Sequence, residues 1–206
     1  MGRDYIRDPA EIYRQSFAAI EAEADLARLP VSLQKVARRM IHACGMTDLV
    51  EDMAWHGDPV GAAHAALDAK APIFCDAQMV ASGIARDRLS GSDIVCEIGN
   101  PRVVDLAKQL GTTRSAAQVE RWRDRLAGAV VAIGNAPTAL YHLIDLIESS
   151  DPKPAAVFAF PVGFVGARES KDELIAAKLG VPFLTLRGRR GGSAIAAAAI
   201  NALGES

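Results

Sequence analysis

The chain has 206 residues, 50% of them apolar and 23% charged, with a formal net charge of −2 at pH 7. These values are typical of one globular domain with a substantial core, and they give no basic field for nucleic acid. The three cysteines, Cys44, Cys75 and Cys96, form no C-x-x-C pair. We therefore expect reduced thiols in the cytoplasm rather than a disulfide framework.

Neither a targeting segment nor a membrane span is expected. The first residues, M-G-R-D-Y-I-R-D, contain no apolar stretch of the kind found in secretory signals. The longest apolar run, A-I-A-A-A-A-I near the C-terminus, is too short to cross a bilayer. The sequence contains no internal repeat and no low-complexity linker that would mark a domain boundary.

The N-terminal part of the chain predicts helices only. Asp8-Pro9-Ala10-Glu11 combines a cap, a proline at the first helical position and a glutamate at N3, which predicts a helix that runs to about Arg28. A second helix is predicted from about Ser32, with Gly45 as the residue that ends it. A third helix is predicted to start at Asp58-Pro59.

Five short apolar runs follow, each with a helical segment after it. The runs are continuous rather than alternating, as expected of strands that are buried on both faces. They span residues 72–75, 93–96, 129–133, 155–160 and 181–186. The alternation predicts an α/β three-layer sandwich with a five-stranded parallel sheet, Rossmann-like, preceded by a helical N-terminal extension. We expect one domain over residues 1–206, with the extension at 1–57 and the core at 58–206.

Glycines and polar residues are concentrated directly after the predicted strands. In parallel sheets this is the edge where ligands bind, and glycine loops let backbone N–H groups approach an anion. The loops match neither G-x-G-x-x-G nor G-x-x-x-x-G-K-[ST], so no nucleotide site is predicted. The four histidines show no metal-ligand spacing, and no metal site is predicted. The edge therefore indicates where a ligand binds but not which ligand.

The stretch K-V-A-R-R-M-I-H-A-C-G-M at 35–46 contains the most informative residue. His42 lies opposite the apolar face of the predicted helix, in a group with Lys35, Arg38 and Arg39. Such a face is either a solvated surface or a site for a negatively charged ligand. A ring that changes charge near neutral pH is suited to general acid work.

Two further residues stand out by their positions. Ser16 falls on the apolar face of the first predicted helix, where a serine usually bonds back to the i−4 carbonyl. Arg114 lies at a predicted helix start, where a cation opposes the helix dipole, and Ser115 and Gln118 have the spacing of a capping box. Each residue is either a ligand contact or an ordinary structural feature.

Long strings across the whole chain resemble the precorrin-8X methylmutase family. They are D-Y-I-R-D-P-A-E-I-Y-R-Q-S-F at 4–17, R-M-I-H-A-C-G at 39–45, T-R-S-A-A at 113–117, A-I-G-N-A-P-T-A-L at 132–140, P-V-G-F-V-G-A-R-E-S-K at 161–171 and G-G-S-A-I at 191–195. The resemblance implies an isomerase of corrin (cobalamin) biosynthesis. In this family a methyl group moves from C-11 to C-12 of precorrin-8X to give hydrogenobyrinate, and no cofactor and no metal are needed.

The resemblance also assigns roles to individual residues. His42 is implied as the catalytic histidine, and Ser16, Arg39 and Arg114 are implied as substrate contacts. The arginines and the glycine-loop amides are expected to hold the carboxylate arms of the tetrapyrrole while His42 donates a proton to its conjugated ring. The implied assembly is a homodimer with the site near the subunit interface, without nucleic acid or membrane partners.

Two alternatives remain open at this point. One is the same reaction on the cobalt-containing precorrin of the anaerobic pathway, which the residues above do not separate from the cobalt-free reaction. The other is a non-catalytic tetrapyrrole carrier, which would need the arginines but no titratable His42.

Overall fold

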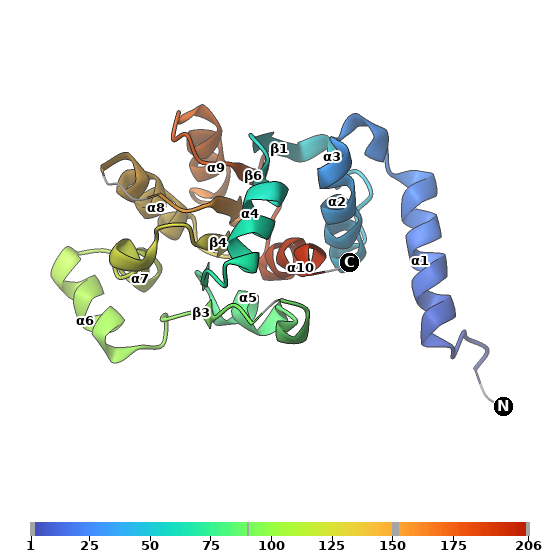
Figure 1. The fold of residues 1–206 in the computed structure, drawn as a ribbon, viewed down its shortest axis with the longest axis horizontal. Helices are drawn as coiled ribbons and strands as arrows, with labels where there is room; N and C mark the ends of the chain where they lie inside the picture. The colour runs from blue at the N-terminus through green and yellow to red at the C-terminus, as the bar shows by residue number, and fades with distance from the viewer. Residues whose placement is uncertain (1–2, 90, 150–152, 205–206) are drawn as a thin grey trace.

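A six-stranded mixed sheet with helices on both faces forms the body of the molecule (Figure 1). The computed structural model of the chain describes residues 3–89, 91–149 and 153–204. The strands are β1 (Met53–His56), β2 (Ile73–Cys75), β3 (Ile94–Val95), β4 (Val130–Ile133), β5 (Ala156–Ala159) and β6 (Phe183–Leu186). The α-helices are α1 (Pro9–Glu23), α2 (Val31–Cys44), α3 (Leu49–Asp52), α4 (Pro59–Asp68), α5 (Gln78–Gly83), α6 (Pro101–Leu110), α7 (Arg114–Glu120), α8 (Pro137–Ser149), α9 (Ala167–Ala176) and α10 (Ser193–Leu203). The 3₁₀ turns are η1 (Leu26–Arg28), η2 (Arg86–Arg88) and η3 (Arg123–Arg125).

The order of the strands corrects the predicted sheet. The order is β1-β6-β5-β4-β2-β3, and β2 to β6 run parallel to one another. These five strands match the five predicted runs, and their order in chain numbering is 2-1-3-4-5, as in flavodoxin-like sheets. The prediction of a five-stranded parallel sheet is wrong, because a sixth strand, β1, pairs antiparallel with β6. The Rossmann-like detail is not confirmed, since the order is that of flavodoxin-like sheets.

Strand β1 lies inside the segment that was expected to be helical. Its sequence, M-A-W-H, is short, and only Met53 and Ala54 are buried. Its place in the sheet depends on pairing with β6, where Met53 lies opposite Leu186. Local pattern carries little information about such a half-buried edge strand. The expected extension of residues 1–57 is therefore helical only up to α3, and its last residues belong to the sheet.

The predicted helix ends depend on local capping, and most of them are confirmed. The side chain of Asp8 accepts a hydrogen bond from the Ala10 amide at 3.0 Å, and Asp58 accepts one from Gly61 at 3.0 Å. Gly45 ends α2 in the left-handed conformation, with φ of 70°. The first helix stops earlier than predicted, at Glu23, and the separate turn η1 covers the rest of the predicted span.

Buried side chains pack on both faces of the sheet. One cluster joins the sheet to α2, α4, α5 and α10, and the other joins it to α7, α8 and α9. Phe74 belongs to the second cluster, whereas its neighbours Ile73 and Cys75 belong to the first. This alternation between two apolar layers explains why the strands read as continuous apolar runs, and it confirms the predicted three-layer arrangement.

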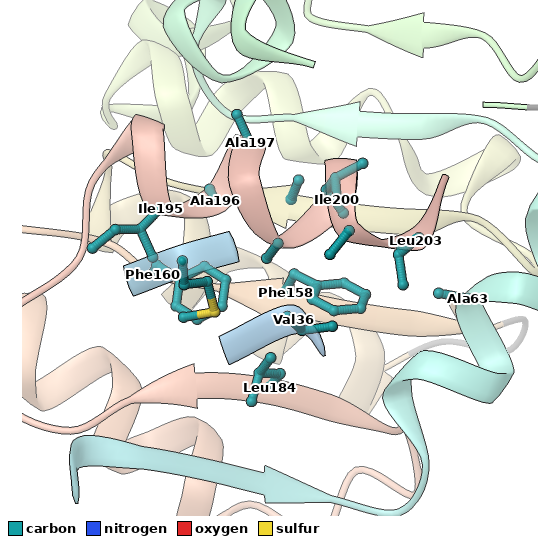
Figure 2. Close-up of a cluster of buried hydrophobic side chains, with 14 of the residues drawn as sticks. Val36, Ala63, Phe158, Phe160, Leu184, Ile195, Ala196, Ala197, Ile200 and Leu203 are labelled. Atoms are coloured by element: carbon teal, nitrogen blue, oxygen red, sulfur yellow. The ribbon is translucent and has the colours of Figure 1, made fainter. Parts of the chain in front are cut away.

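Helix α10 is buried between the sheet and α2. Figure 2 shows Ile200 of α10 close to Phe158 of the sheet and to Val36 of α2, and all three are buried. A Cβ atom on Gly134 would lie 2.8 Å from the Cβ of Ala196, and one on Gly83 would lie 2.7 Å from that of Ala197. Alanine on α10 and glycine on its neighbours therefore set the distance at which these elements pack.

A fully buried lysine holds the loop that leads into α10. Lys171 of α9 has no exposed surface, and its Nζ donates a hydrogen bond to the carbonyl of Arg190 at 2.5 Å. The guanidinium of Arg190 pairs in turn with Asp48 at 2.6 Å. Burial lowers the pKa of Lys171 from its ordinary value of 10.5 to about 8. Folding therefore stabilises the neutral amine relative to the ammonium.

This lowered pKa predicts a pH dependence of stability. Below pH 8 both the folded and the unfolded chain carry the protonated lysine, so the cost of burying its charge is fully present. Between about pH 8 and 10.5 only the unfolded chain keeps the proton, so the contribution of Lys171 to stability rises with pH by roughly 3 kcal/mol at most. Urea unfolding of the wild type and Lys171→Met should give free energies that diverge over this window. The exposed control Lys178→Met should follow the wild type at a constant difference in free energy across this pH range. The same behaviour of Lys171→Met would contradict the prediction.

Candidate functional site

His42 lies between two hollows on the surface of α2. Its side chain is exposed, as its position opposite the apolar face predicted, while Met40 and Ile41 beside it are buried. One hollow, of about 400 Å³, is lined by Arg39, His42, Ala43, Gly83, Ala85, Arg88, Ala194, Ala197, Ala198 and Asn201, and we call it the α10 hollow. The other, of about 300 Å³, is lined by Ser16, Ala19, Ile20, Glu23, Ile41, His42, Gly45 and Thr47, and we call it the α1 hollow. The structure thus brings Ser16, Arg39 and His42 together.

An aromatic pair on α1 holds the histidine and the arginine. The rings of Tyr13 and Phe17 stack with their centroids 4.3 Å apart, and Phe17 lies 5.2 Å from the ring of His42. The guanidinium of Arg39 lies 5.5 Å from the Tyr13 ring and 5.7 Å from the Phe17 ring. These ring and cation–π contacts limit the orientations open to both side chains. Helix α1 is therefore part of the site.

The basic residues of α2 have different roles. Arg38 pairs with Glu21 of α1 at 3.1 Å, so it fastens α1 to α2. Arg39 lines the α10 hollow together with His42. Of the two neighbouring arginines, Arg39 is the one placed to meet a carboxylate in a hollow.

Two segments that are far apart in the sequence complete the α10 hollow. Alanines of α10 form the floor, and the turn after α5 forms the wall. Asn201 ties the two together, because its side chain donates to the carbonyl of Gly83 at 2.9 Å and accepts from the amide of Ala85 at 2.7 Å. The role of Asn201 could not be predicted from the sequence, where its only local signal is a polar residue inside an alanine-rich helix.

Arg114 does not join the other predicted site residues within one chain. It is the first residue of α7, which lies on the opposite side of the sheet from α1 and α2 (Figure 1). The capping-box interpretation of this helix is wrong. The cap is Thr113, whose hydroxyl accepts from the amide of Ala116 at 3.1 Å, and Gln118 is buried and bonded elsewhere. Arg114 itself is exposed.

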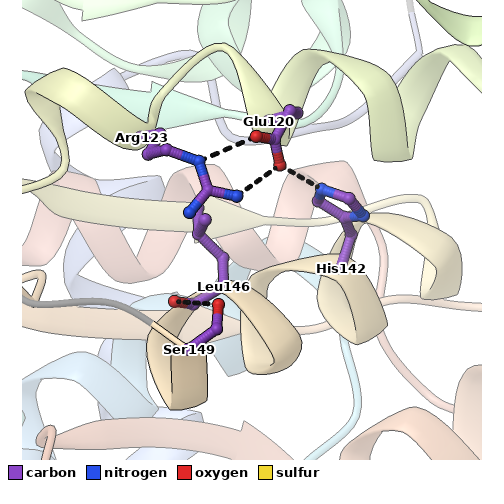
Figure 3. Close-up of polar contacts among 5 residues, drawn as sticks. All are labelled: Glu120, Arg123, His142, Leu146 and Ser149. Atoms are coloured by element: carbon purple, nitrogen blue, oxygen red, sulfur yellow. Dashed lines mark hydrogen bonds and ion pairs between the residues drawn. The ribbon is translucent and has the colours of Figure 1, made fainter. Parts of the chain in front are cut away.

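A polar cluster fixes α7 against α8 (Figure 3). Glu120 accepts a hydrogen bond from Arg123 Nε at 2.7 Å and lies 2.9 Å from His142 Nε2 on α8. The hydrogen bond from Arg123 lowers the pKa of Glu120, and His142 adds to that shift. His142 therefore has a structural partner, and the helix that carries Arg114 is held in place.

The switch point of the sheet, between β2 and β4, is filled by the chain itself. The carboxylate of Asp76 accepts from the amides of Gly134 at 2.8 Å, Asn135 at 3.0 Å and Ala136 at 2.7 Å. Burial raises the pKa of Asp76, and the three amides oppose this shift by stabilising the carboxylate. An internal carboxylate thus occupies the amides of this glycine loop, and the expected role of the other glycine loops stays a prediction.

Gln118 links the residue after β2 to the residues after β3. Its side-chain amide donates to the carbonyl of Asp76 at 2.5 Å and accepts from the amide of Glu97 at 3.2 Å. Glu97 also pairs with Arg121 at 2.9 Å. The carboxyl ends of β2, β3 and β4 are thus joined by hydrogen bonds between protein groups.

The described residues add three plain findings. Cys44, Cys75 and Cys96 are free, and burial raises the pKa of the Cys75 thiol. Across residues 3–89, 91–149 and 153–204, no group of three or more His, Cys, Asp or Glu side chains is placed to hold a metal ion. In the same ranges, no helix is long and apolar enough to cross a membrane.

The geometry is that of a flavodoxin-like α/β core with a basic hollow beside an exposed histidine. Comparison with known proteins identifies the family. The family model of precorrin-8X methylmutase matches residues 11–206. The chain is 55% identical to the precorrin-8X methylmutase of Pseudomonas aeruginosa, over 97% of each chain, and 38% identical to the cobalt-precorrin-8 methylmutase of Priestia megaterium, over 95% of this chain and 87% of that one. The solved precorrin-8X methylmutase of Thermus thermophilus superposes with a TM-score of 0.85 at 36% identity, covering 95% of this chain and 94% of that one.

The chain belongs to the precorrin-8X methylmutase family. It is an isomerase of cobalamin biosynthesis, and the reaction of its family is the shift of a methyl group from C-11 to C-12 of the precorrin.

The closed switch point predicts a stability effect. Asp76→Asn keeps the shape of the side chain but replaces one acceptor oxygen by a donor group, which leaves a buried amide of residues 134–136 without a partner. We expect the free energy of unfolding to fall by roughly 2–4 kcal/mol. Urea denaturation measures this, with the exposed Asp105→Asn as the matched control. Equal stability of the two variants would show that the amides do not depend on Asp76.

Proposed function

We propose that the chain converts cobalt-free precorrin-8X to hydrogenobyrinate, with the substrate seated over His42. The observation that carries the proposal is the position of His42, exposed between two hollows with Arg39 beside it. Identity favours the cobalt-free substrate, because the chain is 55% identical to a precorrin-8X enzyme and 38% identical to a cobalt-precorrin-8 enzyme.

The arrangement accounts for the chemistry of an internal methyl shift. Arg39 binds a carboxylate arm and holds the ring against α2. His42, as imidazolium, donates a proton to the conjugated system, which polarises it and lowers the barrier to migration of the methyl group. The histidine recovers the proton once the methyl has moved, so the reaction leaves atoms and charge balanced. No redox group and no methyl donor enters this sequence of steps.

Ser16 contributes from the other side of His42. It lines the α1 hollow, where its hydroxyl can donate a hydrogen bond to the substrate. A carrier without activity would need Arg39 and Ser16 but would gain nothing from a proton donor between them. The family relationship and the position of His42 both favour the isomerase over the carrier.

We also propose a cytoplasmic homodimer in which the partner subunit's Arg114 completes each site. Helix α1 lies at the edge of the molecule (Figure 1), and Ile12 and Tyr13 on it are 45% and 43% exposed. Apolar side chains of this size on one helix favour a protein partner. Arg114 lies on the other side of the sheet from His42, so a second copy is the simplest way to bring the two residues together.

The role of His42 predicts the behaviour of His42→Asn. Asparagine keeps a hydrogen-bond donor but has no titratable proton, so hydrogenobyrinate should bind almost as well as to the wild type. Turnover of precorrin-8X should fall by roughly 10²- to 10⁴-fold, the usual effect of losing a positioned acid. A single-turnover absorbance assay on both proteins measures this. Near-wild-type turnover by the variant would end the claim that His42 is catalytic.

The dimer predicts complementation between two inactive variants. In a mixed dimer of His42→Asn and Arg114→Ala, one of the two sites would combine an intact His42 with an intact Arg114 from the other chain. Mixing equal amounts under exchange conditions should restore about a quarter of the wild-type sites. Each variant alone, at the same total concentration, is the control. A mixture no more active than the sum of its parts would contradict a shared site.

A further inference from the structure

A second arginine, on another element of the chain, lines the α10 hollow together with Arg39. Arg88 ends the 3₁₀ turn η2 and lines this hollow together with Arg39 and His42. Its backbone packs closely on Gly204, where a Cβ atom would meet the Arg88 carbonyl. The preceding loop is fastened to α10 by the two hydrogen bonds of Asn201. Arg88 is therefore carried by a wall that is fixed to the floor of the hollow.

The two hollows beside His42 differ in charge. The α10 hollow is lined by two arginines and by no acidic side chain. The α1 hollow is lined by Glu23 and by no arginine or lysine. His42 lines both hollows, so a flat ligand that covers His42 would meet opposite charges on its two sides.

We propose that Arg88 is a second carboxylate-binding residue of the site and that, with Arg39, it determines which edge of the macrocycle lies against α10. This proposal rests on the proposed function. Two arginines that line one hollow from different elements can hold two carboxylate arms, each through a bidentate hydrogen bond. Glu23 repels a carboxylate that enters the α1 hollow. The ring is then presented to His42 in one orientation.

Orientation matters because one particular methyl group has to migrate. A ring that can bind in two orientations presents the wrong carbon to His42 in part of its complexes, and those complexes do not react. Loss of Arg88 should therefore weaken binding and also lower the rate from the bound state. Loss of a charge that only attracts the substrate from a distance would affect binding alone.

The test compares Arg88→Ala with Arg86→Ala. Arg86 lies on the same turn, is exposed and lines neither hollow, so it controls for the loss of one positive charge. Hydrogenobyrinate binding is measured by absorbance titration, and KM and kcat are measured with precorrin-8X. Arg88→Ala should weaken product binding roughly 10- to 100-fold and lower kcat, whereas Arg86→Ala should change binding by less than about 3-fold.

Two further variants test parts of the proposal separately. One keeps the positive charge at position 88 without the guanidinium geometry, and the other removes the negative charge of Glu23. Arg88→Lys keeps the charge without the bidentate geometry and should recover only part of the binding. Glu23→Gln removes the repulsion and should bind the product at least as tightly as the wild type. A lower kcat in Glu23→Gln would show that the ring now also binds in the second, unreactive orientation, as proposed. A Glu23→Gln variant that binds clearly more weakly would overturn the assigned orientation.

The outcomes distinguish this proposal from the proposed function. If the wild type neither binds hydrogenobyrinate nor converts precorrin-8X, the proposed function fails, and this proposal fails with it. If the wild type does both and Arg88→Ala behaves as Arg86→Ala does, only the role of Arg88 is overturned. Circular dichroism and urea unfolding show whether each variant is folded, and Arg88→Lys tests the same claim if Arg88→Ala is not.

Discussion

The close packing of α10 between the sheet and α2 is the constraint on which the site depends. Small side chains on α10 pack so closely on Gly83 and Gly134 that a Cβ atom added at either glycine would clash with an alanine of α10. Helix α2 is thereby fixed on α10, with its apolar face inward and His42 outward. The same alanines form the floor of the hollow that Arg39 lines. A larger side chain at Ala197 would push against Gly83 and would disturb the floor and the wall together.

Asp76 is the reason that we place the proposed site away from the edge where parallel sheets usually bind ligands. Its carboxylate takes the place that an anionic ligand would occupy at the switch point, and Gln118 joins the neighbouring strand to it. A buried and satisfied polar network of this kind adds rigidity. The edge of the sheet thus serves as a fixed support, and in the proposed function the substrate binds instead at the hollows beside α2.

How much of the structure could be predicted from the sequence depends on how far apart in the chain the interacting residues lie. The exposed position of His42 and the helix end at Gly45 depend on residues within one or two turns, and pattern was sufficient to predict them. The pairing of β1, the closure by Asp76 and the link made by Asn201 join residues that lie about 60 to 130 positions apart, and no local pattern encodes them. The roles of Ser16 and Arg114 came from the family resemblance, since each also had an ordinary structural explanation.

The central claim is that the tetrapyrrole binds across His42 and not at the edge of the sheet. A crystal structure of the protein with hydrogenobyrinate bound tests it most directly. We expect the ring over His42, with carboxylates at Arg39 and Arg88 and with the amides of residues 134–136 still bonded to Asp76. A macrocycle held by those amides, with Asp76 displaced and His42 facing solvent, would contradict it.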